Sequence, residues 1–164
     1  MELHQPYENL TYYGRGPFEN YIDRYSGAFI GRYEDKVENQ FYWYIRLQET
    51  GNKTDVRWLT LLDSGGLGVK ITGLQPISFS ALHFSPEDLD PGLTRKLQHT
   101  IDIVPQKNIF LHVDLKQRGL GGDNSWGMYP HNEYRLLDKK YTYSYMIELV
   151  EKGSDKNDYL NSRK

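Results

Sequence analysis

The feature that most constrains the fold is a strict alternation of residue types near the end of the chain. Over residues 141–149 every second side chain is aromatic or aliphatic, at Tyr141, Tyr143, Tyr145, Ile147 and Leu149. Residues 109–115 repeat this period of two. Successive side chains of a strand point to opposite faces, so both segments predict strands with one apolar face.

Further strands are expected where short runs rich in aliphatic and aromatic residues lie between glycines or polar turns. These runs are residues 9–13, 28–33, 40–47, 56–63, 68–72 and 77–84. Gly65 and Gly66 predict a hairpin connection, residues 14–17 a tight turn that stops the first strand, and residues 48–55 a loop. Serines at alternate positions of 77–84 predict one solvated face.

Helix signals are sparse. Residues 18–25 suit a loop or a single helical turn, and Ser85 followed by Pro86, Glu87 and Asp88 predicts the start of a short helix. Many strands with little helix predict an all-β fold, and specifically a β-sandwich.

Composition narrows the function classes. The 164 residues suffice for one domain, expected over 1–150, followed by a polar tail over 151–164 that we expect to be disordered. A net charge of −2 argues against nucleic acid or an anionic membrane as partner. Cysteine is absent, which excludes a disulfide or a thiol nucleophile and leaves the compartment undetermined.

The sequence shows no catalytic machinery of its own. Glu19 with Asp23, and Glu87 with Asp88 and Asp90, are the tight acidic clusters outside the charged surface segments, and both have simpler structural roles. The first has Arg15 and Arg24 to pair with, and the second begins a helix. The histidines lack the spacing of a metal site, and no nucleophile elbow or phosphate loop is present. We therefore expect no catalytic residue and no metal ligand in this chain.

One loop has an unusual composition. Residues 119–127, GLGGDNSWG, combine four glycines with one tryptophan. Glycines allow sharp turns and close approaches, and an indole offers a flat apolar face with an N–H at its edge, which suits a sugar. Trp126 is accordingly either a sugar-contact residue or a core residue that closes the end of a sandwich.

Several stretches together carry a family resemblance. YYGRGPFENYIDRY (12–25), QETGNKTDVRW (48–58), FSALHFSPEDL (79–89) and GLGGDNSWG (119–127) occur in this order. The chain resembles the later part of the C-terminal domain of glycoside hydrolase family 2 β-galactosidases. The resemblance implies that residues 1–150 form part of a galactose mutarotase-like β-supersandwich. It also implies that the catalytic glutamates, magnesium and sodium belong to domains absent from this chain, so no cofactor is expected here.

The resemblance also implies residue roles. Trp126 would reach into the active-site pocket and give the galactoside an aromatic platform. Glu49 would belong to a loop near that pocket. Gly121, Gly122, Asp123 and Asn124 would shape the loop that carries Trp126, and the Asp and Asn side chains would accept from nearby backbone N–H groups.

The function expected is that of a non-catalytic domain fragment of a β-galactosidase, which hydrolyses terminal β-D-galactose residues. Its partners would be the galactoside, the other domains of the same chain and further copies of the enzyme in a homo-oligomer. Two alternatives stay open: an independent carbohydrate-binding module, and a purely structural assembly domain.

Overall fold

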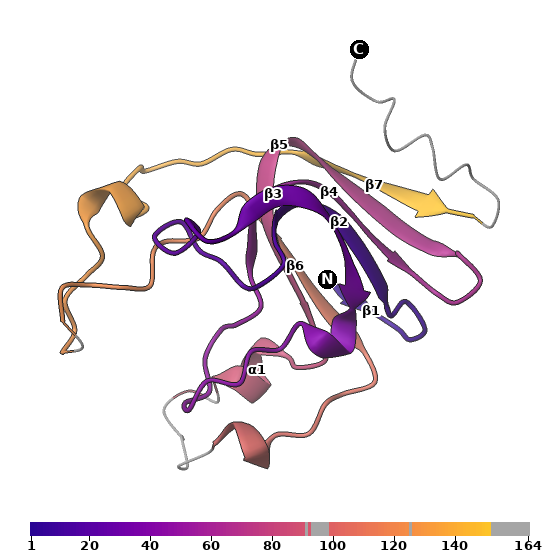
Figure 1. The fold of residues 1–164 in the computed structure, drawn as a ribbon, viewed down its shortest axis with the longest axis horizontal. Coiled ribbons are helices and arrows are strands. Elements are labelled where there is room, and N and C mark those ends of the chain that lie inside the picture. Colours follow the sequence, from indigo (N-terminus) through magenta and orange to yellow (C-terminus); the bar gives the residue numbers. More distant parts are fainter. Residues whose placement is uncertain (91, 93–98, 125, 152–164) are drawn as a thin grey trace.

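A computed structural model describes residues 1–90, 92, 99–124 and 126–151. The expected tail, apart from residue 151, lies outside these described residues. Strands dominate the described chain, with one short α-helix and a few 3-10 turns (Figure 1). The elements are β1 (Glu2–Leu3), β2 (Asn9–Gly16), β3 (Phe29–Lys36), η1 (Val37–Asn39), β4 (Lys53–Leu62), β5 (Gly68–Leu82), α1 (Pro86–Leu89), η3 (Thr100–Asp102), β6 (Ile109–Asp114), η4 (Asn132–Tyr134) and β7 (Tyr145–Val150).

The strands form one antiparallel sheet of seven strands in the order β1-β6-β5-β4-β2-β3, with β7 also paired to β5. The sheet curls round its own core (Figure 1). Tyr12 of β2 touches Phe79 of β5 with ring centroids 5.3 Å apart, although β4 lies between these strands in the sheet. The all-β prediction is confirmed, and the curled sheet is consistent with a β-sandwich.

The main core lies on the inner face of this curl. Its buried residues come from β2, β4, β5 and β6 with one from η1, and they are Leu10, Tyr12, Val37, Val56, Leu59, Leu61, Ile71, Ile77, Phe79, Ala81, Ile109 and Leu111. The alternation predicted over 109–115 is confirmed in its first half, where Ile109 and Leu111 are buried while His112 is exposed, whereas residues 113–115 are all half-buried. Burial of these side chains is the main favourable term for the fold.

The turn expected at residues 14–17 does not stop the first strand, because β2 runs on to Gly16. A Cβ at Gly14 would lie 2.8 Å from the Cα of Val56, which is too close for any side chain. The glycine therefore allows a close approach of β2 to the neighbouring chain and does not mark a turn.

The two strands expected at 68–72 and 77–84 are one continuous strand, β5. Its first half pairs with β7 and its second half with β6, while β4 runs along the other edge. The hairpin between β4 and β5 is confirmed. Asp63 accepts from the N–H groups of Gly65 (2.7 Å) and Leu67 (2.9 Å), and Gly66 has φ +85°.

The expectation of a solvated face on residues 77–84 is wrong, because Ser78 and Ser80 are both 3% exposed. Both serines lie on the outer face of β5, opposite the main core, and each lines a cavity there together with residues of the 48–55 segment. That segment was predicted to be a loop, but β4 already begins at Lys53.

The strand expected at residues 40–47 is absent from the described chain, where only Arg46 forms an isolated bridge, to His99. Trp43 and Ile45 are exposed in place of facing a core. The N–H of Tyr42 donates to the Thr50 hydroxyl, so a side chain takes the place of a strand partner.

The strand expected at 141–149 begins only at Tyr145. Before that point the Gln75 side chain bonds both backbone groups of Ser144. Pro76 has no N–H to offer to a ladder, and from Ser78 onward β5 pairs with β6. The predicted apolar face of β7 is exposed, with Leu149 at 82%.

The short helix is confirmed. Ser85 caps α1, accepting from the N–H of Asp88, while the Asp88 carboxylate accepts from the N–H of Ser85. No helix among the described residues is long and apolar enough to cross a membrane.

Candidate functional site

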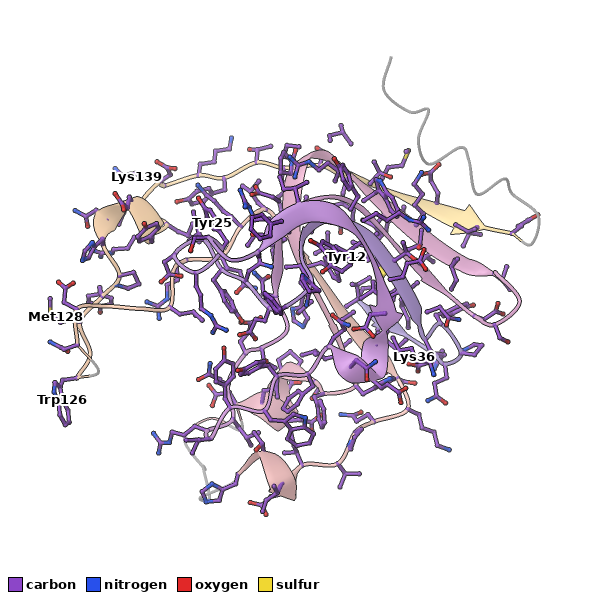
Figure 2. All side chains as sticks on the ribbon, in the orientation of Figure 1. Tyr12, Tyr25, Lys36, Trp126, Met128 and Lys139 are labelled. Atoms are coloured by element: carbon purple, nitrogen blue, oxygen red, sulfur yellow. The ribbon has the colours of Figure 1, made fainter. Side chains whose placement is uncertain are left out.

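The glycine-rich loop leaves the sheet after β6 and projects away from it. We call residues 119–134 the tryptophan arm; residue 125 within it is not described. The N–H of Gly119 donates to the carbonyl oxygen of Tyr134 (2.7 Å) and closes the arm at its base. Figure 2 shows Trp126 and Met128 at the far end, and the Trp126 side chain is 92% exposed. Trp126 therefore does not close the end of the sandwich in this chain.

Local contacts determine how the arm turns. The Asn124 side chain accepts from the N–H of Trp126 (2.8 Å), a contact of the kind that shapes tight turns. A Cβ on Gly122 would lie 2.4 Å from the carbonyl oxygen of Met128, so only glycine lets the two sides of the arm approach. Gly127 has φ +107°, a conformation that L side chains rarely adopt. The position of the Trp126 ring at the end of the arm thus depends on the Asn124 hydrogen bond and on two glycines.

Asp123 differs from the prediction, since its described partner is a side chain and not a backbone N–H. Its carboxylate lies 2.7 Å from Nε2 of His131 on the returning side of the arm. Hydrogen bonding to Asp123 raises the pKa of His131 above its usual value. Both groups are exposed, so solvent weakens this cross-link across the arm.

Glu49 lies beside the base of the arm. Its carboxylate accepts from the Tyr21 hydroxyl (2.5 Å) and is also bonded by Gln117, just before the arm. Although the residue as a whole is exposed, partial removal of its carboxyl from water raises the pKa of Glu49 to about 7. The bond from Tyr21 opposes this shift, and the charge of Glu19 adds to it.

Glu49 also lines a cavity of about 290 Å³ on the outer face of β5, with Leu82 and His112 among the other walls. The predicted position of Glu49 in a loop near the active-site pocket stays a prediction.

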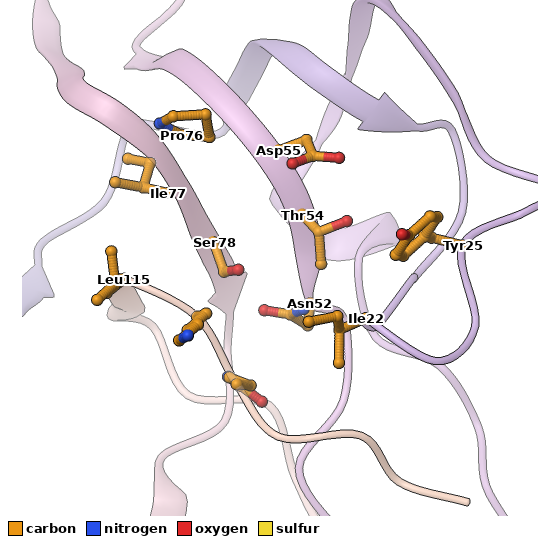
Figure 3. A pocket seen from close by; sticks show the side chains of 11 residues that line it. Ile22, Tyr25, Asn52, Thr54, Asp55, Pro76, Ile77, Ser78 and Leu115 are labelled. Atoms are coloured by element: carbon orange, nitrogen blue, oxygen red, sulfur yellow. The ribbon is translucent and has the colours of Figure 1, made fainter. Parts of the chain in front are cut away.

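A second cavity of about 290 Å³ lies near the start of β4 (Figure 3). The side chains of Asn52, Thr54 and Ser78 point into the same space (Figure 3). Asn52 is fully buried, its amide donates to the carbonyl oxygen of Asn20 (2.8 Å), and its own oxygen finds no partner among the described residues. The unpaired Asn52 oxygen can therefore accept a hydrogen bond from a water molecule or a hydroxyl group in the cavity.

The acidic cluster around Glu19 is structural. Its buried carboxylate accepts from the Thr50 hydroxyl (2.9 Å) and the N–H of Gly51 (2.7 Å), and from the Tyr44 hydroxyl. Arg24 lies 3.5 Å away, as predicted. Arg15, the other predicted partner of this cluster, pairs with Asp55 at 2.5 Å. These hydrogen bonds link the segment of Glu19 to the segments of Tyr44 and Thr50, so the carboxylate has a structural role.

Metal ligands are not gathered anywhere in the described ranges: no group of three or more His, Asp or Glu side chains could hold an ion there. The sequence analysis missed two contributors to the arm, Asp23 and His131. Asp23 reaches the arm from another part of the chain, because it bonds to Gly121, 98 positions away. His131 lies within the arm and pairs with Asp123 across it, at a spacing that marks no motif.

Comparison with known proteins identifies the family. The family model described as "Beta galactosidase small chain" matches residues 1–147. The chain belongs to the β-galactosidase small-chain family. A β-galactosidase of Priestia megaterium is 37% identical over 147 residues, and one of Streptococcus thermophilus is 37% identical over 144 residues. A β-galactosidase of Vibrio vulnificus is 31% identical over 143 residues.

These matches cover 89%, 87% and 87% of this β-galactosidase domain, in the same order, but only 14%, 14% and 13% of the relatives themselves. The chain thus spans about one seventh of the length of the β-galactosidases that it resembles. It corresponds to one part of these longer proteins. The tryptophan arm, up to Tyr134, lies within the matched residues.

Proposed function

We propose that this domain is the C-terminal part of a glycoside hydrolase family 2 β-galactosidase and that it is not itself catalytic. In the assembled enzyme, which releases terminal β-D-galactose residues, it lends Trp126 as an aromatic wall of the sugar pocket. The reacting groups and the metal ions belong to the rest of the enzyme. The ordered motifs of the sequence support the family and the C-terminal position.

The observation that carries this proposal is the exposure of Trp126. A tryptophan normally buries much of its large surface, yet this one is 92% exposed at the end of an arm whose turns are specified by glycines and hydrogen bonds. Leaving such a side chain in water is unfavourable unless something covers it. A sugar fits, because its C–H face packs on the indole while its hydroxyls reach the edge N–H and solvent.

The state of the acidic residues supports a non-catalytic role. A glycosidase needs two carboxyl groups facing each other across the scissile bond. Here Glu19 is saturated by loop donors, Asp88 caps α1, and Asp23 accepts from a backbone N–H. Of the acidic residues singled out in the sequence, Glu19, Asp23 and Asp88 thus have structural partners, while Glu87 is exposed on α1.

Replacement of Trp126 in the assembled enzyme tests the proposal. Trp126→Ala should raise KM for a chromogenic galactoside by roughly 2- to 12-fold, the equivalent of one aromatic contact of about 0.5–1.5 kcal/mol. Trp126→Phe, which keeps a ring, should lose less. Trp43→Ala is the matched control, since Trp43 is also exposed but lies outside the arm.

Steady-state kinetics on the purified variants provide the measurement. Unchanged KM and kcat in Trp126→Ala, in enzyme that assembles normally, would rule out the aromatic wall. The domain would then serve in assembly alone.

A further inference from the structure

A carboxylate stands beneath the tryptophan arm, at the tip of a tight turn in another part of the chain. Tyr21 and Arg24 bond to each other through their backbones, with N···O distances of 3.3 and 2.8 Å. Ile22 and Asp23 are therefore the two central residues of the turn. The Asp23 side chain leaves this turn toward the arm.

The turn is fixed to the sheet through Asn20, the residue that precedes it. The N–H of Asn20 donates to the carbonyl oxygen of Asn52 (2.8 Å), and the Asn20 side chain accepts from the N–H of Thr54 in β4 (3.0 Å). Tyr21 is fully buried, and its hydroxyl donates to Glu49. Asp23 is thus held by a rigid support and not by a free loop.

Asp23 contacts the first glycines of the arm. The N–H of Gly121 donates to its Oδ2 at 2.8 Å. A Cβ on Gly119 would lie 2.7 Å from the same oxygen and 2.8 Å from Cβ of Tyr134, whereas a Cβ on Gly121 would lie 3.5 Å away. The carboxylate therefore occupies the space that Gly119 leaves open at the base of the arm.

The second carboxylate oxygen indicates what Asp23 is for. Oδ1 is buried and has no hydrogen-bond partner among the described residues. A buried, unpaired oxygen lowers stability. Stability alone would favour a smaller or apolar side chain here, so the single bond from Gly121 to Oδ2 is the gain that Asp23 supplies.

From Gly121 a short series of contacts leads to Trp126. Gly122 packs against the carbonyl of Met128, Asn124 accepts from the N–H of Trp126, and Asp123 pairs with His131. These contacts shape the outer part of the arm, but none of them joins the arm to the sheet. The bond from the Gly121 N–H to Asp23 does so, because it links the first residues of the arm to a turn that is anchored on β4.

We infer that Asp23 is a positioning residue for Trp126: by accepting the Gly121 N–H from a turn anchored on β4, it fixes the direction in which the arm presents the indole. The effect on galactoside binding rests on the function proposed above for Trp126. The effect on the arm itself does not.

Kinetics of the assembled β-galactosidase test the link to Trp126. Asp23→Ala should raise KM, by no more than Trp126→Ala does, and leave kcat nearly unchanged. Asp23→Asn should behave like the parent enzyme, because the Asn carbonyl oxygen still accepts the Gly121 N–H. In the double variant Asp23→Ala/Trp126→Ala, loss of Asp23 should add little to the loss of Trp126.

Full additivity in that cycle, or failure of Asp23→Asn to restore KM, would overturn the inference. A purely structural Asp23 would instead lower stability and activity in the presence and absence of Trp126 alike.

Hydrogen exchange measured by mass spectrometry tests the arm independently of sugar binding. Asp23→Ala should speed exchange in a peptide covering residues 119–124, and Asp23→Asn should not, while a β2 peptide stays unchanged in both. Unchanged exchange of residues 119–124 in Asp23→Ala would overturn the inference even if KM rises. If Trp126→Ala has no kinetic effect but exchange responds as expected, the aromatic wall fails and the positioning role of Asp23 stands.

Discussion

At the scale of single residues, Glu49 is the titratable group whose state can change near neutral pH at the base of the arm. Its carboxyl group is hydrogen-bonded by the side chains of Tyr21 and Gln117 and lies near the negative charge of Glu19. Burial raises the pKa of Glu49 from 4.5 to about 7. The folded state thus holds a proton that the unfolded chain releases at a lower pH.

The sign of the resulting pH dependence follows by linkage. A carboxyl whose pKa is raised on folding contributes stability that is fully present below its unfolded pKa of 4.5 and is lost as pH rises through about 7. We therefore expect unfolding midpoints to fall between about pH 5 and about pH 7.5, and to fall less in Glu49→Gln. Urea denaturation followed by circular dichroism at both pH values measures this.

Glu87→Gln is the control for removing one negative charge, because Glu87 is exposed on α1. This variant should keep the pH dependence of the parent. An equal pH dependence in Glu49→Gln and the parent would show that Glu49 does not bind its proton more tightly in the folded chain.

Composition singled out the loop of Trp126 but left this residue as either a sugar contact or a core residue, so its place in a sugar pocket rests on the family resemblance and stays a prediction. The contact of Asn124 could be predicted from the local sequence, because its side chain bonds an N–H two positions on. Asp23 could not, because its bond to Gly121 joins segments 98 positions apart. A side chain's partner across such a distance is set by the curl of the sheet, which the local pattern does not encode.

At the scale of elements, the arm shows two different uses of glycine. Gly119 and Gly121 both face Asp23, at Cβ distances of 2.7 and 3.5 Å from Oδ2. The distance at Gly119 is shorter than real Cβ contacts, and a Cβ there would also lie 2.8 Å from Cβ of Tyr134. The distance at Gly121 is that of an ordinary van der Waals contact. Room for a side chain therefore differs sharply between the two positions.

Alanine substitution separates these two positions. Gly119→Ala should displace the base of the arm and raise KM in the assembled enzyme, because the added Cβ would meet the Asp23 carboxylate and Cβ of Tyr134 at the same time. Gly121→Ala should be tolerated, with KM close to that of the parent enzyme. Kinetics together with hydrogen exchange of residues 119–124 provide the readout, and equal behaviour of the two variants would contradict the steric argument.

The elements themselves were predictable to different degrees. Segments with one buried face, such as β6, follow their alternation because the core enforces it. Residues 40–47 carry strand-forming side chains but lack a strand partner among the described residues, so intrinsic preference was overridden. In β7 the alternation predicted the strand but not its exposure, since none of the described residues covers its outer face.

At the scale of the whole molecule, the exposed apolar side chains fit a chain that spans about one seventh of its relatives. Trp126, Ile45, Ile101 and Leu149 are each more than 80% exposed, at 92, 86, 84 and 82%. Isolated apolar side chains are common on protein surfaces, but under the function proposed above other parts of the enzyme would cover these four.

A wall element and an independent carbohydrate-binding module differ in what the separate chain can bind. One aromatic contact contributes about 0.5–1.5 kcal/mol beyond its buried area, whereas a dissociation constant of about 1 mM requires about 4.1 kcal/mol. Within the part of the chain that the structure describes, the indole of the arm is 92% exposed and no residue covers it, so the separate 164-residue chain should show no saturable binding of galactose or lactose in the millimolar range. Isothermal titration with each sugar measures this, with circular dichroism to verify folding. Saturable binding that disappears in Trp126→Ala would instead make the chain a carbohydrate-binding module, because the arm would then form a sugar site without the rest of the enzyme.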